Sequence, residues 1–504
     1  SDVCSSDLKV SSDITHLITL AIDTNENSQI QFADGVTQIV EAFPPKIINE
    51  QFLPFLVNWL PRNNQIIASS IVDAIPAISE AAGGISKLVE LIDALISSEN
   101  NDICSKVFKT IEDLKGDNDD EVVLIVKRIA KSKYDLVRKY AIKLLDLVES
   151  NDTKAEICLQ LASDTAFLVR IAVAEYIPKM DEKNAENIAR ELMVDQHARI
   201  RAYLPIACSK MGFFYSLIVE KFINDKDWSV RASLANNLVD ANDHVQSCKV
   251  VTKLISDKIW QVKLCALRTL TSLLNSTLDL KFTDGLHVLS LLSNLIQTKQ
   301  YPLKIAVIDC FFAISNHCKN EISIDKLQSF VDHLVLLEKP NIKLHFIELI
   351  ANSKDKDLSL LVQNNIGSII DALSQDEQWR VRLGVVKNLH LLYEMIPEAT
   401  HKEEYYKVCV RLAEDEAFPV RIAAIQYLAK YFISEGNKIP DSVKEMKTKD
   451  SFRKRQIALQ IMDEMKKLTD DIAFKEELLT QMKSFQNDEC INVALLAKQL
   501  VEAA

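Results

Sequence analysis

Apolar residues recur at helical spacing along most of the chain, in pairs of segments that short polar turns separate. In one unit, the first segment has apolar residues spaced for one face of a helix: Ala155, Ile157, Cys158, Leu161 and Ala162. After the polar turn Asp164-Thr165-Ala166, a second stripe predicts a more deeply buried helix: Leu168, Val169, Ile171, Ala172, Ala174, Ile177 and Met180. Neither helix could bury its stripe alone, so the pattern predicts that successive helix pairs stack on one another.

Fourteen such pairs fit between residues 12 and 503. The second helix of each pair is expected to begin near residue 29, 65, 101, 135, 168, 198, 228, 260, 302, 341, 379, 418, 451 or 489. Units of two helices are typical of HEAT repeats, because an armadillo unit needs a third short helix and a tetratricopeptide unit keeps a fixed period of about 34 residues. The predicted fold is therefore all-α: an α-solenoid, or superhelix, of about 14 HEAT repeats, each an antiparallel helix pair. Residues 1–8 lack a starting Met and fit no repeat, so we expect a non-native or disordered leader there and a single solenoid over residues 9–504.

A polar signature returns in most units: an Asp, five residues, then Arg or Lys. It occurs at Asp164/Arg170, Asp195/Arg201, Asp225/Arg231, Asp257/Lys263, Asp376/Arg382 and Asp415/Arg421, and weaker copies keep only the basic residue, at Arg138, Lys304, Lys343 and Arg455. The Asp can accept hydrogen bonds from free amides near the start of the second helix. The base can reach its own Asp or that of an adjacent unit, which predicts a structural Asp–Arg ladder through the stack. Exposed pairs contribute about 0–1 kcal/mol each, so we expect the ladder to set turn geometry and register more than total stability.

Composition narrows the function classes. Hydrophobic residues make up 48% of the chain, Gly and Pro number 9 and 12, the net charge is −12 and the pI is about 5.4. This balance argues against nucleic-acid binding or attachment to an anionic membrane, since both need a basic surface. No run of about 18 apolar residues and no signal peptide is found. None of the ten cysteines forms Cys-x-x-Cys, so we expect buried free thiols in a reducing compartment.

No catalytic or metal-ligating pattern stands out. None of the nine histidines makes a His-Glu pair or a His-x-x-x-His spacing, and no Gly-x-x-x-x-Gly-Lys phosphate loop occurs. Gly83-Gly84 is expected to be a turn between helices. We therefore expect a protein that is not an enzyme and needs no cofactor or metal, with a HEAT-fold lyase or hydroxylase as the enzyme alternative.

Two turns carry a more specific resemblance. Residues 375–383 read Gln-Asp-Glu-Gln-Trp-Arg-Val-Arg-Leu, and residues 225–231 read Asp-Lys-Asp-Trp-Ser-Val-Arg. Both resemble the turns of the scaffold (A, 65 kDa regulatory) subunit of protein phosphatase 2A. They fall in repeats seven and eleven, where that family has its tryptophan turns. The start, from Gln29-Ile30-Gln31 to residues 52–56, resembles that family's first repeat and the entry to its second. Here Ser229 stands where the family usually has Arg, and the chain has fourteen units where the family has fifteen.

The resemblance implies partners and contact residues. Regulatory B-type subunits would dock on the turns of about residues 12–300, and the phosphatase catalytic subunit on those of about residues 340–504. Carried over, the catalytic-subunit contacts are Trp379, Arg380, Phe418, Phe452 and Arg453, and the regulatory-subunit contacts are Tyr134, Asp135, Phe167, Leu168, Asp227 and Trp228. An exposed aromatic residue beside an Arg is also the usual composition of a binding hot spot. The alternative is that each aromatic side chain fills a gap between neighbouring repeats.

The resemblance thus implies a non-catalytic scaffold in a heterotrimer, with no nucleic-acid, membrane or small-molecule partner. A cytoplasmic location is expected, with the nucleus left open as a second one. Another HEAT adaptor, such as a nuclear transport receptor-like protein, is the alternative function.

Overall fold

The computed structural model describes residues 21–22, 25–60, 64–97, 100–114, 119–277, 280, 282–317, 339–352, 367, 369–394, 402–447 and 451–502. The chain divides into two compact units, residues 1–243 and 244–504, and each is described by itself. The predicted leader, residues 1–8, lies outside the described residues. The expectation of a single solenoid over residues 9–504 stays a prediction.

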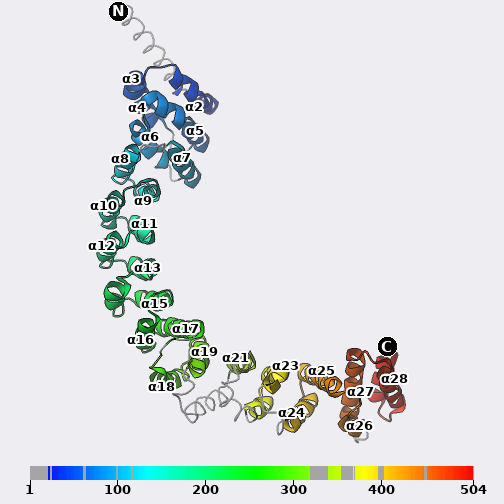
Figure 1. The fold of residues 1–504 in the computed structure, drawn as a ribbon. Helices are drawn as coiled ribbons and strands as arrows, with labels where there is room; N and C mark the ends of the chain where they lie inside the picture. Colours follow the sequence, from blue (N-terminus) through cyan, green and yellow to red (C-terminus); the bar gives the residue numbers. More distant parts are fainter. Residues whose placement is uncertain are drawn as a thin grey trace, which may run out of the picture. The chain divides into compact units, whose positions relative to one another are not determined.

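The first unit contains the second helices of repeats one to seven (Figure 1). These are α2 (Glu26–Glu41), α5 (Gln65–Ala82), α7 (Asn101–Leu114), α9 (Asp135–Leu144), α11 (Phe167–Tyr176), α13 (Ala198–Cys208) and α15 (Trp228–Asn237). The first helices are α3 (Pro45–Ile47), η1 (Ile48–Phe52) and α4 (Leu53–Trp59), then η2 (Ile85–Leu88) with α6 (Val89–Ile96), α8 (Asp119–Ile129), α10 (Asn151–Ala162), α12 (Glu182–Leu192), and η5 (Phe214–Val219) with α14 (Glu220–Phe222). Short 3-10 turns follow two of the second helices, η3 (Leu145–Leu147) and η4 (Ile177–Lys179).

The second unit contains the second helices of repeats eight to fourteen. These are α17 (Trp260–Ser276), α19 (Tyr301–His317), α21 (Pro340–Asn352), α23 (Trp379–Glu394), α25 (Phe418–Glu435), α27 (Phe452–Leu468) and α29 (Ile491–Glu502). The first helices are α16 (His244–Ile255), α18 (Gly285–Leu295), α24 (Lys402–Ala413), α26 (Asp441–Lys447), and α28 (Ile472–Lys483) with η6 (Ser484–Asn487). No strand occurs among the described residues.

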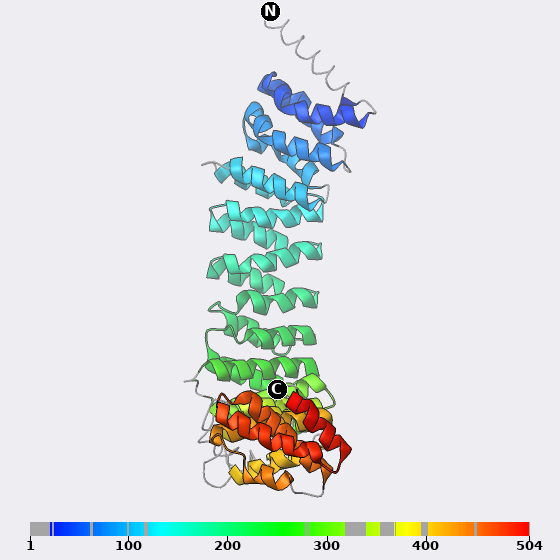
Figure 2. The ribbon, with the colours of Figure 1, turned by 90° about the vertical axis from the view of Figure 1, so that its right-hand side faces the viewer.

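Within each unit the helices stack as the apolar pattern predicts. Second helices pack on one another in sequence order, for example α11 on α9 and α13, or α25 on α23 and α27. First helices do the same, as α12 does on α10, and Figure 2 shows the helices of residues 119–243 as successive layers. Buried aliphatic side chains such as Val169, Ile200 and Val230 fill the space between the layers. The all-α HEAT solenoid of about fourteen helix pairs is therefore confirmed.

The predicted starts of the second helices are confirmed within three residues throughout. Short polar residues cap several helices: the side chains of Ser150, Asp181 and Asp471 accept amide hydrogen bonds at the starts of α10, α12 and α28. The predicted glycine turn is also present, because Gly83 and Gly84 have φ values of +85° and +130°, which L side chains rarely adopt.

The described cysteines are free, and most of them are buried, whereas Cys4 and Cys318 lie outside the described residues. Burial raises the pKa of the Cys158 thiol to about 12. Among the described residues, no group of three or more His, Cys, Asp and Glu side chains is placed to hold a metal ion. In the same part of the chain, no helix has the length and apolar character needed to cross a membrane.

A candidate protein-docking ridge

The Asp–Arg ladder joins successive turns at several places in each unit. The guanidinium groups of five arginines bind both carboxylate oxygens of the Asp in the following repeat, with Nε–Oδ2 distances of 2.5–2.8 Å and Nη2–Oδ1 distances of 2.8–3.2 Å. The pairs are Arg138–Asp164, Arg170–Asp195, Arg201–Asp225, Arg382–Asp415 and Arg455–Asp488, and Lys343 binds Asp376 in the same way with its single ammonium. Of the two partners that the sequence left open, the structure therefore selects the Asp of the next repeat.

The same groups also fix the turn in which they lie. The Nη1 atom of Arg382 donates to the carbonyl oxygen of Asp376 in its own turn, at 2.6 Å. The carboxylate of Asp415 accepts from the amide of Ala417, the residue just before α25, at 2.8 Å. Both contacts recur at Asp164/Arg170, Asp195/Arg201 and Asp225/Arg231, so each of these turns is held from within its own repeat and from the repeat before it.

The ladder pairs are nearly buried, which corrects the expectation of exposed pairs. The side chains of the cations are 6–15% exposed and those of the carboxylates 6–9%. Burial alone would raise the pKa of Asp415, but the hydrogen bonds from Arg382 and from the Ala417 amide outweigh it and hold the pKa below its usual value. The hydrogen bond to Asp415 raises the pKa of Arg382. Removing one member of such a pair leaves a buried charge, so the ladder matters for stability as well as for register.

Arg231 contacts its own Asp through the main chain. Its Nη1 atom donates to the carbonyl oxygen of Asp225 at 2.7 Å, while the carboxylate of Asp225 binds Arg201 of the preceding repeat. Arg421 makes the same contact with the carbonyl oxygen of Asp415, also at 2.7 Å. Both bases thus contact the main chain of their own Asp. Arg231 and Arg421 are partly buried.

The ladder is interrupted at Lys263, where the prediction of a ladder contact is wrong. Its side chain forms no hydrogen bond or ion pair with the residues that the structure describes. The reason is in the next turn, where Thr298 occupies the position of the Asp and offers no carboxylate. Asp257 keeps its local role and accepts from the Ile259 amide at 2.8 Å.

Three ladder cations that the sequence showed only as weak copies prove to be full members: Arg138, Lys343 and Arg455. Asp488 was missed altogether. Their positions within the repeat identify them. Each of these bases is the fourth residue of a second helix, and its partner Asp lies three residues before the start of the next second helix. Pairing each base forward by one repeat would have identified Asp488.

The aligned turns display large side chains at the starts of the second helices. We call this row, within each unit, the ridge. In the second unit it carries Trp379, Arg380, Phe418, Phe452 and Arg453. Exposed fractions of 62% for Phe418 and 46% for Phe452 exclude the gap-filling alternative for these two side chains. Lys454 of one turn lies 3.4 Å from Glu414 of the previous one, which adds an ion pair between the turns of repeats twelve and thirteen.

Cations lie against the aromatic faces of this ridge. The guanidinium of Arg380 lies 4.8 Å from the centre of the Trp379 ring, and that of Arg421 lies 5.7 Å from the centre of the Phe418 ring. Trp379 is partly buried, while Arg380 and Arg453 are exposed. The ridge of the second unit thus offers apolar rings and guanidinium groups together, the composition that protein interfaces favour.

The first unit has a ridge of the same kind, with more varied roles. Trp228 is 45% exposed and Leu168 43% exposed, although the sequence pattern also counted Leu168 in the buried stripe. Phe167 instead bridges two repeats, with its ring centre 5.2 Å from that of His197 and 5.8 Å from the Arg199 guanidinium. For Phe167 the gap-filling alternative therefore describes the structure better.

The remaining residues of this ridge are Tyr134, Asp135 and Asp227. Asp135 is exposed, and Tyr134 is partly buried with Lys133 4.8 Å from its ring centre. Asp227 caps α15, accepting from the amide of Ser229 at 2.9 Å and from its hydroxyl at 2.7 Å. These two hydrogen bonds lower the pKa of Asp227. Asp227 therefore has a structural role whatever docks beside it.

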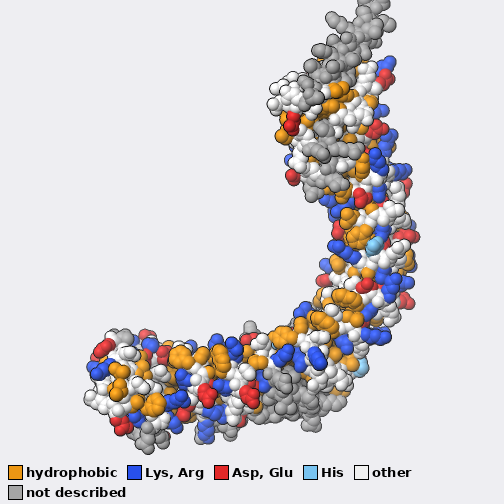
Figure 3. Space-filling view, turned by 180° about the vertical axis from the view of Figure 1, so that it is seen from behind, with side chains coloured by type: hydrophobic (Ala, Val, Ile, Leu, Met, Phe, Trp, Pro, Cys, Tyr) orange, Lys and Arg blue, Asp and Glu red, His pale blue; other side chains and the backbone are white. Residues whose placement is uncertain are grey.

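Charge on the surface is mixed. On the face shown in Figure 3, Lys and Arg side chains lie interspersed with Asp and Glu in both units. No basic stripe for a phosphate backbone is seen on that face, in line with the net charge of −12.

Stacked helix pairs joined by this ladder define a solenoid of HEAT type with a ridge of exposed aromatic and charged side chains. Solved structures with a similar fold include Kap121p, alone and bound to Ste12p. Each matches with a TM-score of 0.54 and 12% sequence identity, and the match covers 98% of this chain and 56% of the Kap121p chain. Importin β matches with a TM-score of 0.45, 10% identity, and coverage of 98% of this chain and 75% of that one. The chain therefore spans little more than half of the Kap121p chains that it resembles. No family model and no curated protein matches the sequence.

Proposed function

We propose that this chain is a non-catalytic scaffold that binds other proteins along its ridge. The observation that carries the proposal is the exposure of Trp228, Phe418 and Phe452 at the starts of stacked helices. Exposing large apolar side chains to water is unfavourable, and rows of them rimmed by charged groups mark interaction sites. The ladder beneath holds the turns in place, so that little conformational entropy is lost when a partner docks.

The finer proposal is a scaffold of the protein phosphatase 2A type. It rests on the resemblance of the two tryptophan turns and on the places of the implied contacts. The catalytic-subunit residues, Trp379 to Arg453, begin three second helices of one unit. A B-type regulatory subunit would occupy the ridge of the first unit. Holding both subunits on one chain would raise the effective concentration of the phosphatase near the substrate that the regulatory subunit selects. A cytoplasmic location belongs to this proposal.

The test is direct binding of the purified chain to a phosphatase 2A catalytic subunit. We expect Trp379→Ala with Arg380→Ala to weaken binding by at least about 2 kcal/mol, the usual cost of losing a hot-spot pair. Phe452→Ala should also weaken binding. Leu468→Ala is the matched control, because Leu468 is 40% exposed at the opposite end of the same helix, α27.

Absence of binding to the catalytic subunit would overturn the phosphatase proposal. Equal losses for Phe452→Ala and Leu468→Ala would overturn the assignment of the ridge. The alternative is a transport receptor-like adaptor, which is suggested by the fold shared with Kap121p, a protein solved in complex with Ste12p. Binding to a GTP-loaded small GTPase, without binding to the phosphatase subunit, would support this alternative.

A further inference from the structure

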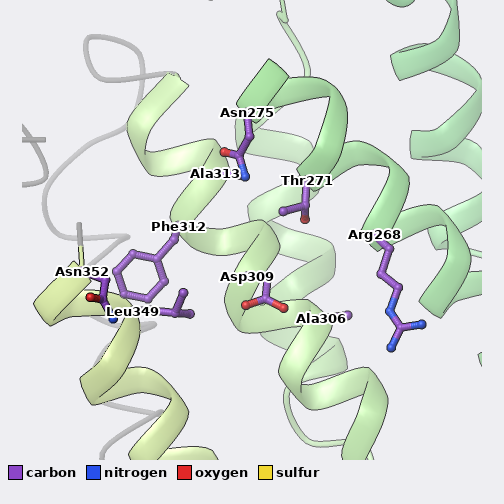
Figure 4. A pocket seen from close by; sticks show the side chains of 9 residues that line it. All are labelled: Arg268, Thr271, Asn275, Ala306, Asp309, Phe312, Ala313, Leu349 and Asn352. Atoms are coloured by element: carbon purple, nitrogen blue, oxygen red, sulfur yellow. The ribbon is translucent and has the colours of Figure 1, made fainter. Parts of the chain in front are cut away.

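A pocket of about 390 Å³ lies on the face formed by the second helices of repeats eight to ten (Figure 4). Arg268 and Asn275 come from α17, Asp309 and Phe312 from α19, and Leu349 and Asn352 from α21. Asn275 and Asn352 lie at the C-terminal ends of their helices, whereas the ridge is formed by helix starts. The pocket is therefore a separate site on the same unit.

Small side chains on the central helix create the room. Ala306 and Ala313 of α19 line the pocket and are buried, as is the ring of Phe312 beside them. On α17, Thr271 turns its hydroxyl back to the carbonyl oxygen of Leu267, at 2.8 Å. The floor is consequently apolar, and the polar groups that remain available lie around it.

The two charged groups that line the pocket differ in how they are engaged. The Oδ1 atom of Asp309 accepts a hydrogen bond from Nε2 of His345, on α21, at 2.7 Å. Arg268 is exposed, and its side chain forms no hydrogen bond or ion pair with any residue in the described part of the chain. The pocket therefore has one cation available for an anionic group of a ligand.

The two carboxamides add capacity for peptide groups. Asn275 is exposed, and its side chain makes no hydrogen bond to the described residues. Asn352 donates one hydrogen bond to the carbonyl oxygen of Glu348, at 2.8 Å, which leaves its own oxygen available. A carboxamide carries both a donor and an acceptor, so it matches the N–H and C=O groups of an extended chain.

We propose that this pocket binds an extended segment of a partner polypeptide, which places an apolar side chain on the floor and an acidic side chain against Arg268. Asn275 and Asn352 bind the main chain of the segment on either side of the apolar residue. Charge complementarity selects the acidic side chain, since Arg268 has no acidic partner among the described residues and Asp309 is hydrogen-bonded to His345. The site takes a short linear segment, whereas the ridge offers a row of folded turns.

The experiment selects dodecapeptides from a random phage-displayed library on the immobilised full chain. Soluble Arg268→Glu chain is present as competitor to remove peptides that bind elsewhere. Enriched peptides should pair an acidic residue with a nearby apolar one. In fluorescence anisotropy, synthetic copies should bind Arg268→Glu about tenfold or more weakly, and Asn275→Ala more weakly than wild type. Replacing the peptide's acidic residue with Lys should restore binding to Arg268→Glu.

Lys430→Glu is the control matched to Arg268→Glu. Lys430 is an exposed cation on α25, a second helix of the same unit, and its side chain contacts no charged partner among the described residues. It should leave peptide affinity unchanged, as should Trp379→Ala with Arg380→Ala. The proposal is overturned if no peptide is enriched, if Arg268→Glu binds the peptides within twofold of wild type, or if the ridge variant alone abolishes binding. Because the ridge variant is scored separately with the phosphatase subunit, failure of the pocket and failure of the ridge are distinguishable.

Discussion

Replacing Asp415 with Ala tests whether the ladder stabilises the stack. The variant removes the two carboxylate oxygens that accept hydrogen bonds from Nε and Nη2 of Arg382, at 2.6 and 2.8 Å. It also removes the acceptor of the Ala417 amide, at 2.8 Å. Arg382 is 15% exposed, so its charge would be left largely without water or a counterion. Losing one partner of a buried pair typically costs about 3–5 kcal/mol. Arg382 keeps its contact with the Asp376 carbonyl oxygen, which places the expected loss near the lower end, about 3 kcal/mol.

The chain supplies a matched surface pair between the same two repeats. Arg411 of α24 binds Asp371 at 2.9 Å, with exposed fractions of 43% and 56%. Because exposed pairs contribute about 0–1 kcal/mol, Asp371→Ala should cost less than about 1 kcal/mol. Urea unfolding followed by circular dichroism gives the change in free energy of unfolding. Hydrogen exchange of peptides from α23 and α25 shows whether the loss is local to this junction.

The pH dependence provides a second check on Asp415. Since its pKa is lowered in the folded state, the stabilisation it provides is present above the unfolded pKa of about 3.9 and is lost as the pH falls through the folded value. The difference between wild type and Asp415→Ala should therefore shrink in acid. Equal losses for Asp415→Ala and Asp371→Ala at neutral pH would refute the reasoning. So would failure of the apolar double variant Arg382→Met with Asp415→Leu to recover part of the lost stability.

Three further predictions concern other parts of the chain. Phe418→Ala should leave the melting temperature nearly unchanged because the ring is exposed, whereas Phe432→Ala, in the buried face of the same helix, should cost about 3–5 kcal/mol in urea unfolding. The hydrogen bond to Asp309 raises the pKa of His345, so the stability lost in His345→Gln should be largest below the unfolded pKa of about 6.5 and should vanish as the pH rises through the folded value. Burial raises the pKa of Cys158 to about 12, so a thiol reagent followed by mass spectrometry should label it in urea and leave it unlabelled in the native chain at pH 8.

Sequence periodicity was enough to predict the fold, because each repeat obeys the same local rules. The second helices at Gln65, Asp135 and Trp228 begin at the predicted residues. A polar turn followed by an apolar stripe determines such a start without reference to distant parts of the chain. The starts of α2 and α29 differ from the prediction by three and two residues.

The chemistry between repeats was harder to predict, because it depends on how closely neighbouring turns approach. The sequence could place Asp415 and Arg382 in successive turns, but their burial follows from the stacking of α23 and α25. The bridging role of Phe167 likewise depends on His197 and Arg199 of the next repeat. The pocket was missed because Arg268, Asn275 and Asn352 look like ordinary solvent-exposed residues until α19 places its small alanines between them.

The ladder has a direction, and this direction explains how exposed rings on the ridge can be held in place. Wherever a pair forms, the base reaches forward, so the turn of one repeat is fixed by the helix of the repeat before it. A ridge aromatic lies between the two ladder residues of its own repeat, as Phe418 lies between Asp415 and Arg421. Its backbone is therefore ordered before any partner arrives, and docking need not order it again. Where Thr298 stands in place of the Asp, its hydroxyl accepts a hydrogen bond of 3.4 Å from the Gln300 amide. The ridge at Tyr301 lacks the support of an ion pair from Lys263. We therefore expect Tyr301 to contribute less to partner binding than ridge residues whose turn is held by a ladder ion pair from the preceding repeat.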